Sequence, residues 1–357
     1  MKARELGRHR LDNLFVTRPR GGSAPEVVAA LGAMQAQDYA GALWAIGLRL
    51  PGSTLGDIEQ AVVERTIVRT WPMRGTLHFV AAADVGWLLD LLSARVLKAA
   101  AKRREGLGLD ATTLRKIERT VVHALEGGVA LTRDALAERL TREAISPEGG
   151  RLYHSLLWLS LHQVLCFGVP EGKQQTSVLL DEWVPTRRRL DKDEALVELA
   201  TRFLRSHGPA TQQDLMRWAG LTAVEAKLGI SGARAIANER VEGVQYYFPD
   251  DQTPLTADSK GTLLLPGFDE YILGYRDRGM ILAAEHAAKI VPGANGVFRP
   301  TIVHDGEVVG TWQASVNKKS VRLTAEGFAA LSKVQERAFV RAAARYGAFV
   351  GRAALVA

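Results

Sequence analysis

The sequence predicts an α+β protein, mainly helical, with three tandem winged helix-turn-helix units followed by a C-terminal β-hairpin and helix region. The order of helical and β-rich segments predicts this fold, and the charge indicates the kind of partner. Segments of helical period are followed by pairs of β-rich segments, and this cycle recurs along the 357 residues. The net charge is +7, which suits a protein that binds polyanions such as nucleic acid. The expected segments are 1–108, 109–190, 191–258 and 259–357.

The first segment is expected to hold several helices and one hairpin. Helical periodicity covers 4–18, Glu26 to about Gln35, 42–50 and the stretch that starts at Thr54. Pro25 suits the first turn of the second helix. The β-rich runs 66–71 and 75–80 then flank a Pro-Met-Arg-Gly turn and predict a hairpin. Helices followed by a hairpin are typical of a winged helix.

The cycle is expected to recur twice. Helices over 113–125 and 150–163 precede a strand pair at 164–168 and 177–180, and a helix over 194–206 opens the third unit. Thr211 and Asp214 there resemble a capping box, and 244–248 is a candidate wing strand. The similar segments 127–136 and 207–215 are the best internal evidence of repetition.

The last hundred residues change character. A buried strand at 263–265 leads to the acidic pair Asp269-Glu270, whose side chains would point to opposite faces of a continuing strand and therefore form no acid–base couple. A hairpin is expected through Asp305-Gly306, and a second, basic tip at 316–321. A helix from Thr324 to about Ala348 is expected to close the chain.

Several classes of chemistry lack their sequence signature. Cys166 is the single cysteine, so an internal disulfide and a cysteine-based zinc site are excluded. No phosphate-binding loop, serine elbow, zinc motif or dinucleotide fingerprint occurs, so we expect no cofactor and no metal. No apolar run approaches the roughly 18 residues of a membrane helix. We therefore expect a cytoplasmic protein without a membrane partner.

Gln35 and Gln37 flank Ala36 where the N-terminal helical pattern gives way to a turn. Residues two apart on a regular helix diverge, so both amides can face one pocket only if the helix ends there. One hypothesis is that they cap the helix end. The other is that they form a catalytic pair that positions a water and stabilises charge through hydrogen bonds, since amides are poor acids and bases.

Such weak chemistry suffices only where the bond to be broken is already labile. The glycosidic bond of an N7-alkylated guanine is such a bond, because the departing base already carries positive charge. No acid is then needed to protonate the leaving group. The enzyme need only hold the sugar and present a water to the oxocarbenium-like state.

Basic residues in the hairpins are candidate DNA contacts. Arginine-bearing wings commonly contact phosphates or the minor groove, although a solvated strand surface is the alternative for each residue. An ion-paired turn near DNA is the interpretation for the arginines that follow Tyr275. The candidates are Arg69, Trp71, Arg74, His78, Arg276, Arg278, Lys318 and Lys319.

Several motifs together resemble the AlkZ/YcaQ-like winged-helix DNA glycosylases. The resemblance spans nearly the whole chain in the right order. It is carried by Gln35-Ala36-Gln37-Asp38, the segment 70–78 (TWPMRGTLH), the segment 265–278 (LPGFDEYILGYRDR), Asn295–Pro300, Gly310-Thr311-Trp312 and the segment 344–351.

The resemblance implies three winged helices in a C-shaped, basic scaffold and metal-free, monofunctional excision of bulky or crosslinking N7-guanine adducts. The partner it implies is double-stranded DNA with alkylated bases, and three fused units suggest a monomer. The family's catalytic glutamines fall on Gln35 and Gln37. Another branch has aspartate at the second position, so glutamine points to the branch linked to self-resistance against DNA-alkylating natural products. The alternative is a non-enzymatic winged-helix DNA-binding protein or transcription regulator.

Overall fold

The computed structural model describes residue 2, residues 5–256 and residues 261–357. The chain divides into two compact units: a larger unit of residues 1–59 and 196–357, and a central unit of residues 60–195. The divisions fall within α4 (Leu55–Val63) and α10 (Lys192–His207). The helices expected at the start of the chain thus belong to the larger unit, and the hairpin expected to follow them belongs to the central unit. The expected boundary at 258 lies outside the described residues.

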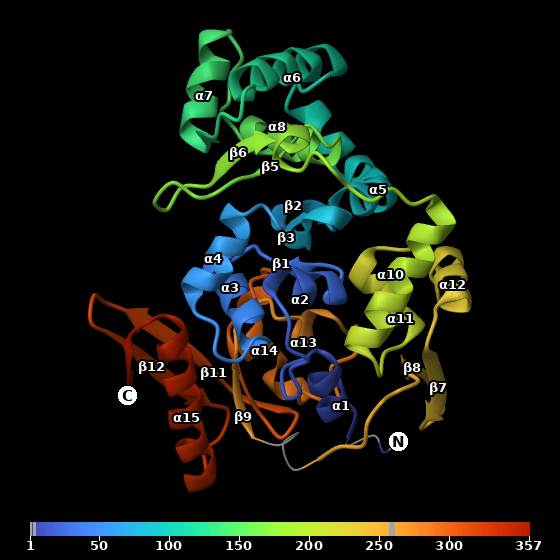
Figure 1. The fold of residues 1–357 in the computed structure, drawn as a ribbon, viewed down its shortest axis with the longest axis vertical. Coiled ribbons are helices and arrows are strands. Elements are labelled where there is room, and N and C mark those ends of the chain that lie inside the picture. Colours follow the sequence, from blue (N-terminus) through green and yellow to red (C-terminus); the bar gives the residue numbers. More distant parts are fainter. Residues whose placement is uncertain (1, 3–4, 257–260) are drawn as a thin grey trace. The chain divides into compact units, whose positions relative to one another are not determined.

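The central unit contains a mixed set of helices and short strands (Figure 1). Its helices are α5 (Val85–Gly106), α6 (Ala111–Leu125), α7 (Arg133–Arg142), α8 (Arg151–Leu161) and α9 (Leu180–Trp183). Its strands are β2 (Ile67–Met73), β3 (Thr76–Ala81), β4 (Leu131–Thr132), β5 (Leu165–Phe167) and β6 (Thr176–Leu179). Within this unit the strand order is β3-β2-β5-β6-β4.

Elements α6, β4, α7, α8, β5 and β6 follow the helix, helix, helix, hairpin order expected of 109–190, with β4 added. The order follows from local signals. Asp110 caps α6 by accepting from the Thr113 amide, and Thr132 caps α7 by accepting from Ala135. Leu114, Ile117 and Val121 recur at helical spacing on the buried face of α6 and join the apolar core of this unit.

Most helices of the larger unit come from the first sixty residues and from the third quarter of the chain. Its helices are α1 (Leu6–Asn13), α2 (Ala24–Leu31), α3 (Tyr39–Leu48), the greater part of α10, α11 (Gln212–Ala219), α12 (Ala223–Gly232), α13 (Glu270–Leu273), α14 (Ala287–Ile290) and α15 (Lys333–Phe349). Its strands are β1 (Met34–Gln35), β7 (Ile236–Val241), β8 (Val244–Pro249), β9 (Thr262–Leu265), β10 (Thr301–His304), β11 (Glu307–Val316), β12 (Ser320–Gly327) and β13 (Ala353–Val356).

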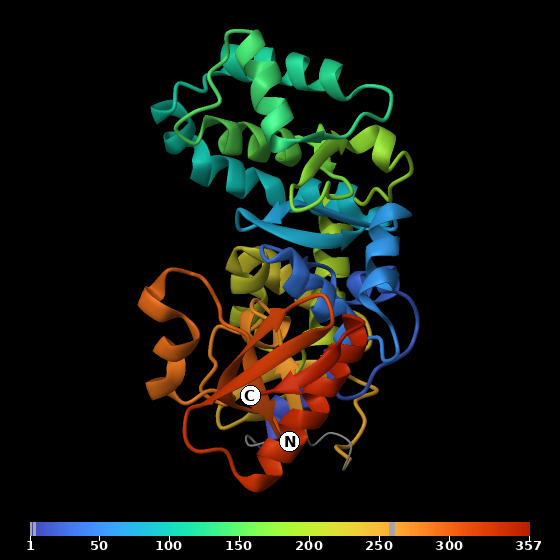
Figure 2. The same cartoon turned by 90° about the vertical axis from the view of Figure 1, so that its left-hand side faces the viewer.

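A five-stranded sheet, in the order β13-β12-β11-β10-β9, forms the C-terminal part of the larger unit, and α15 lies along it (Figure 2). The expected Asp-Gly hairpin is present. Asp305 and Gly306 adopt φ values of 51° and 91°, as a tight hairpin turn between β10 and β11 requires. The expected basic tip is present too, because β11 ends at Val316 and β12 starts at Ser320.

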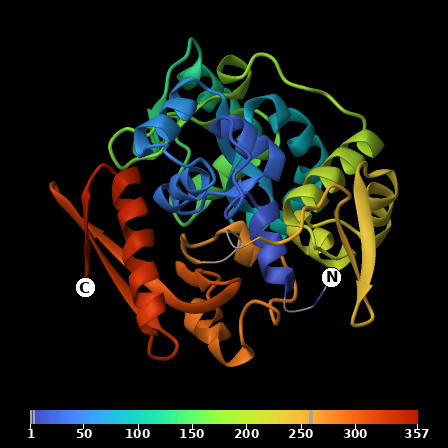
Figure 3. The ribbon, with the colours of Figure 1, turned by 60° about the horizontal axis from the view of Figure 1, so that its bottom comes forward.

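Elements α10, α11, α12, β7 and β8 supply the helices and hairpin expected of 191–258, and Figure 3 shows β7 and β8 as a two-stranded ribbon. The expected capping box of α11 is confirmed. The Thr211 hydroxyl and amide both donate to Asp214, at 2.9 and 2.8 Å, while the Asp214 amide donates back to the Thr211 oxygen.

Several local expectations are wrong. The helix expected over 4–18 ends at Asn13. The helix expected to run to Gln35 ends at Leu31, because Gly32 takes a positive φ of 80° and breaks the helical path. Thr324 lies in β12, paired with Gln313, so the closing helix starts only after the Ser332 cap. The chain after β9 does not continue as a strand, since α13 starts at Glu270.

None of the helices in the described segments combines the length and the apolar character needed to span a membrane.

Candidate active site

Gln35 and Gln37 lie in the connection between α2 and α3, outside any helix. Met34 and Gln35 form β1, Gln37 lies at a bend, and Asp38 precedes the first turn of α3 in extended conformation. Exposure alternates along the connection: Gln35 is half-buried, Ala36 is fully buried and Gln37 is exposed. Gln35 is the last residue of a strand and Gln37 follows it at a bend, so neither side chain is placed by a regular helix. The divergence expected of two glutamines on a helix therefore does not arise.

A buried carboxylate holds the backbone of this connection. The Gln35 amide N–H donates to Glu270 Oε1 at 3.2 Å, and Glu270 is only 1% exposed. Trp218 Nε1–H donates to Glu270 Oε2 at 2.8 Å, and His207 Nε2 lies 3.3 Å from the same oxygen. The α2–α3 connection is thus tied to the first residue of α13, which α10 and α11 support through these two side chains.

The neighbouring carboxylate has a different task. Asp269 makes a bidentate pair with Arg49, with N–O distances of 2.9 and 3.1 Å, and neither side chain is exposed. It also caps α13 by accepting from the Tyr271 amide at 2.9 Å. Asp269 and Glu270 have separate partners, which agrees with the expectation that they form no acid–base couple. The physical reason differs from the expected one, because the two residues lie at the start of helix α13 and not on a strand.

The arrangement of the glutamines permits a limited chemistry. A carboxamide offers donors and an acceptor but does not exchange protons readily near neutral pH. Two such groups in one short connection can orient a water and stabilise developing charge. Within the described part of the chain, no group of three or more His, Cys, Asp or Glu side chains is arranged to hold a metal ion.

Most of the candidate DNA-contact side chains of the central unit are buried or hydrogen-bonded within that unit. Trp71 is 3% exposed and packs against Phe167 at 4.9 Å between ring centroids, so it is a core residue and the expected DNA contact is corrected. Arg69 is buried and donates a hydrogen bond to the Gln175 side chain. Its guanidinium is therefore engaged within the sheet.

The β2–β3 hairpin contains the other two candidates of the central unit, Arg74 at the turn and His78 in β3. Arg74 Nη2 lies 3.1 Å from His78 Nε2, and His78 Nδ1 lies 2.8 Å from the Thr76 carbonyl oxygen. His78 is fully buried, so it supports the turn and does not offer a contact, which corrects that expectation. Arg74 is half-buried and remains a candidate contact at the turn.

Arg276 and Arg278 differ although they are two residues apart. Arg276 is exposed, and its side chain donates to Gln213 at 3.0 Å. Arg278 is half-buried, donates to the Ile272 carbonyl at 2.6 Å and lies over the Phe298 ring. Burial, followed by the nearby Arg217 charge, lowers the pKa of Arg278 to about 10. Arg276 is thus the more available of the two for a phosphate.

Lys318 and Lys319 are exposed at the turn between β11 and β12, as expected. Asn317 orders this turn, because its side-chain oxygen accepts from the backbone amides of Lys319 and Ser320 at 2.9 and 2.8 Å. The two ammonium groups are therefore presented by a defined turn at the end of two long strands.

Glu270, His207 and Trp218 were not among the sequence-predicted site residues. Their signal in the sequence is weak: an acidic pair beside an apolar strand, and an indole at an apolar helical position. Glu270 lies 235 residues from Gln35 along the chain, so only the tertiary fold reveals their contact.

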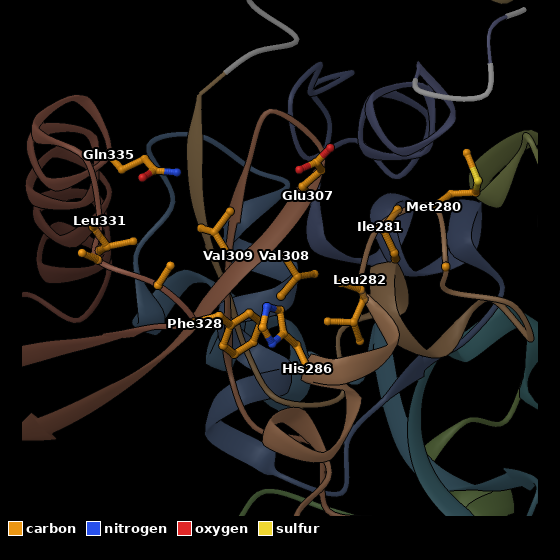
Figure 4. A pocket seen from close by; sticks show the side chains of 14 residues that line it. Met280, Ile281, Leu282, His286, Glu307, Val308, Val309, Phe328, Leu331 and Gln335 are labelled. Atoms are coloured by element: carbon orange, nitrogen blue, oxygen red, sulfur yellow. The ribbon is translucent and has the colours of Figure 1, made fainter.

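The larger unit also contains a hollow of about 380 Å³ away from the predicted residues. Figure 4 shows its apolar lining around His286, whose ring lies 4.4 Å from Phe328. None of the candidate site residues lines it, and Glu307 and Gln335 are its other polar side chains. It is not a candidate for the catalytic site.

Comparison with known proteins identifies the class. The family model for DNA glycosylases of the AlkZ-like type matches residues 28–349, so the chain is a DNA glycosylase, a hydrolase of N-glycosyl bonds. It belongs to the AlkZ-like family. This membership confirms the resemblance noted from the motifs and favours an enzyme over a non-enzymatic regulator.

Two relatives extend the comparison. The chain is 29% identical over 340 residues to an interstrand DNA cross-link repair glycosylase of Streptomyces sahachiroi, and the alignment covers 88% of each chain. The solved structure of the Streptomyces sahachiroi DNA glycosylase AlkZ superposes over 100% of both chains with a TM-score of 0.79 and 24% identity. The second comparison establishes the shared fold.

Proposed function

We propose that this enzyme hydrolyses the N-glycosidic bond of N7-alkylated guanine in double-stranded DNA, including bulky and crosslinked adducts. Gln37 positions the attacking water, and Gln35 stabilises that water or the sugar. The enzyme is monofunctional and uses no metal or other cofactor. It acts as a monomer in the cytoplasm, in DNA repair or in self-resistance to a DNA-alkylating natural product.

The observation that carries the proposal is the extended connection around Ala36. Gln35 and Gln37 flank this buried alanine in a segment whose backbone is tied to Glu270. The exposed Gln37 is the better placed of the two to meet a water, whereas the half-buried Gln35 is suited to a second contact. Neither group is a strong base, so the proposal requires a leaving group that needs no protonation.

The preference for N7-alkylated guanine follows from that requirement. Alkylation at N7 puts a positive charge on the base, and departure of the base neutralises it. The transition state then resembles an oxocarbenium ion. A water held by amide oxygens adds to the sugar C1 as the bond from C1 to the base breaks, and the proton that this water loses passes to solvent. The activity of the Streptomyces sahachiroi relative, interstrand DNA cross-link repair, supports extending the substrate class to crosslinks.

We propose that DNA is held by three tandem winged helix-turn-helix units in a C-shaped basic scaffold. Helix and hairpin elements in the expected order at 111–179 and 192–249 support two of these units. Contacts to the DNA backbone are proposed for Lys318, Lys319 and Arg276, which are exposed, and for Arg74.

The test is excision from duplex DNA that carries one N7-alkylguanine, scored as alkali-labile sites with a small and with a bulky adduct. Excision above the spontaneous rate is expected, and none on either adduct would overturn the proposal. Gln37→Ala should abolish excision while salt-sensitive DNA binding persists. Full activity of this variant would overturn the role of Gln37.

The matched control is Gln60→Ala, which removes an exposed glutamine of α4. It should excise at the wild-type rate. Sequence-specific protection of undamaged DNA without any excision would instead support a DNA-binding regulator, and gel filtration would then be expected to show a dimer.

A further inference from the structure

We infer that Glu270 is a positioning residue for base excision: its carboxylate fixes the backbone at Gln35 and thereby the placement of both glutamine side chains. The inference rests on the proposed roles of Gln35 and Gln37. Glu270 reaches the reaction only through the connection that it holds, so it is not itself a catalytic group.

The two oxygens of Glu270 face different parts of the larger unit. Oε1 accepts from the Gln35 amide at 3.2 Å, and Oε2 accepts from the Trp218 indole at 2.8 Å. The carboxylate is 1% exposed, so water does not readily replace either partner. A carboxylate is the side chain of this length that accepts at both ends, which explains the residue type.

His207 completes the site from α10. The Ser206 hydroxyl donates to the Arg202 carbonyl at 2.7 Å, so Ser206 Oγ is left to accept from His207 Nδ1–H at 2.8 Å. His207 is fully buried, and its ring stacks on Phe203 at 4.5 Å between centroids. The histidine is therefore held by its other ring atoms, and its Nε2 is directed at Glu270 Oε2, 3.3 Å away.

The hydrogen bond from the Gln35 amide to Glu270 lies in a segment with little regular structure. The connection between α2 and α3 has only the two-residue strand β1 as regular structure. Gln35 is the last residue of β1, and Gln37 follows two residues later. Loss of the acceptor at Gln35 removes one hydrogen bond from the backbone that carries both amides. Displacement of a positioning group by about 1 Å can lower a reaction rate roughly a hundredfold.

A substitution pair tests this mechanism specifically. Glu270→Gln keeps one acceptor oxygen but puts an NH₂ group against the Trp218 N–H, so two donors face each other. Trp218→Phe removes that indole donor while it keeps most of the volume. In the double variant the carboxamide oxygen accepts from Gln35, and its NH₂ no longer faces an indole donor.

The measurement is the single-turnover excision rate at saturating enzyme, together with DNA affinity and hydrogen exchange of the Gln35 amide. Glu270→Gln should slow excision by about tenfold to a hundredfold and speed exchange at Gln35, with DNA affinity unchanged. Trp218→Phe should have a small effect, and the double variant should recover most of the rate and of the exchange protection.

The matched control is Asp269→Asn, which alters the adjacent buried carboxylate, whose partners are Arg49 and the Tyr271 amide and not the Gln35 amide. It should lower the stability but leave the rate per folded molecule unchanged. An unaltered rate in Glu270→Gln, an equal loss in Asp269→Asn, or no recovery in the double variant overturns the inference.

Gln37→Ala separates this inference from the proposed function. If Gln37→Ala abolishes excision while Glu270→Gln leaves it intact, the positioning role alone fails. If Gln37→Ala excises at the full rate, the proposed function fails, and the positioning role of Glu270 for that site fails with it.

Discussion

Arg49 and Asp269 form a bidentate ion pair in which both side chains are inaccessible to solvent. Arg49 also donates to the Leu14 and Ala45 carbonyls at 2.8 Å each. The pair therefore joins the end of α3 to the N-terminal cap of α13, the short helix that begins with Glu270. A charge buried this completely is tolerated only because its partner and the two carbonyls satisfy it.

Replacement of Asp269 by Asn should lower the free energy of unfolding by about 3 kcal/mol, because the Arg49 guanidinium would stay buried without its counter-charge. Urea denaturation measures the change. Arg142→Gln is the comparison, since Arg142 pairs with Glu138 in solvent and such pairs contribute less than about 1 kcal/mol. A loss for Asp269→Asn no larger than for Arg142→Gln would contradict this account.

The free energy of unfolding should fall on acidification partly because of His9. Burial lowers the pKa of His9 from its usual 6.5, with Asp12 opposing this effect. The Gln252 amide lies 2.9 Å from His9 Nδ1, an arrangement in which the neutral ring accepts a hydrogen bond. The folded state therefore disfavours the charged ring, and the unfolded chain takes up the proton first as pH falls below 6.5.

The contribution of His9 is thus fully present above pH 6.5 and is lost as pH falls toward the lower folded pKa. His9→Asn offers an acceptor in place of Nδ1 without titrating. Its urea denaturation curves should show a shallower dependence on pH below 6.5 than those of the wild type. An identical pH dependence of the two proteins would show that His9 does not titrate differently on unfolding.

Removal of the basic tip between β11 and β12 should weaken DNA binding through the salt-dependent part of the affinity. Each phosphate contact contributes about 0.9 to the slope of log K against log salt concentration on duplex DNA. Lys318→Ala with Lys319→Ala should therefore reduce that slope by about 1.8 if both residues contact phosphates. Lys333→Ala, an exposed lysine at the start of α15, is the control. An unchanged slope would place the tip away from the DNA.

Cys166 should be inert in the folded enzyme. Its side chain is fully buried in β5, and burial raises the pKa of the thiol well above its usual range. The nucleophilic thiolate is then absent at moderate pH. Iodoacetamide should leave the native protein unlabelled at pH 8 and should label it in urea, as mass spectrometry would show. Rapid labelling of the native protein would mean that β5 opens readily.

Local chemistry predicted much of the element order. The Asp305-Gly306 turn and the capping box at Thr211 are signals within four residues, and both appear where expected. The sequence predicts a closing helix from Thr324, but Thr324 pairs with Gln313 in a sheet, and this pairing is not visible in the local sequence. The sequence also predicts that the helix before Gln35 continues, since its apolar periodicity runs through Met34, but Gly32 ends that helix.

The availability of the candidate DNA-contact residues likewise depends on tertiary burial, which the sequence does not show. Arg69, Trp71 and His78 lie in the strands of a hairpin, and the sequence alone does not indicate which face of the hairpin is buried. The structure puts Trp71 into the core of the central unit, and it gives Arg69 and His78 partners within the sheet and turn. The exposure of the lysines at the β11–β12 turn could be predicted from the sequence, because charged side chains in a turn between two strands normally lie in solvent.

The sequence by itself determined the family, the basic charge and the glutamine pair, because these depend on residue identity and order. Only the tertiary structure decided that the pair lies on an extended connection and that Glu270 holds it there. Hydrophobic periodicity reports which face of a segment is buried, but it carries no information on which distant side chain will meet a given backbone amide. That contact arises when α10, α11 and α13 pack around one buried carboxylate.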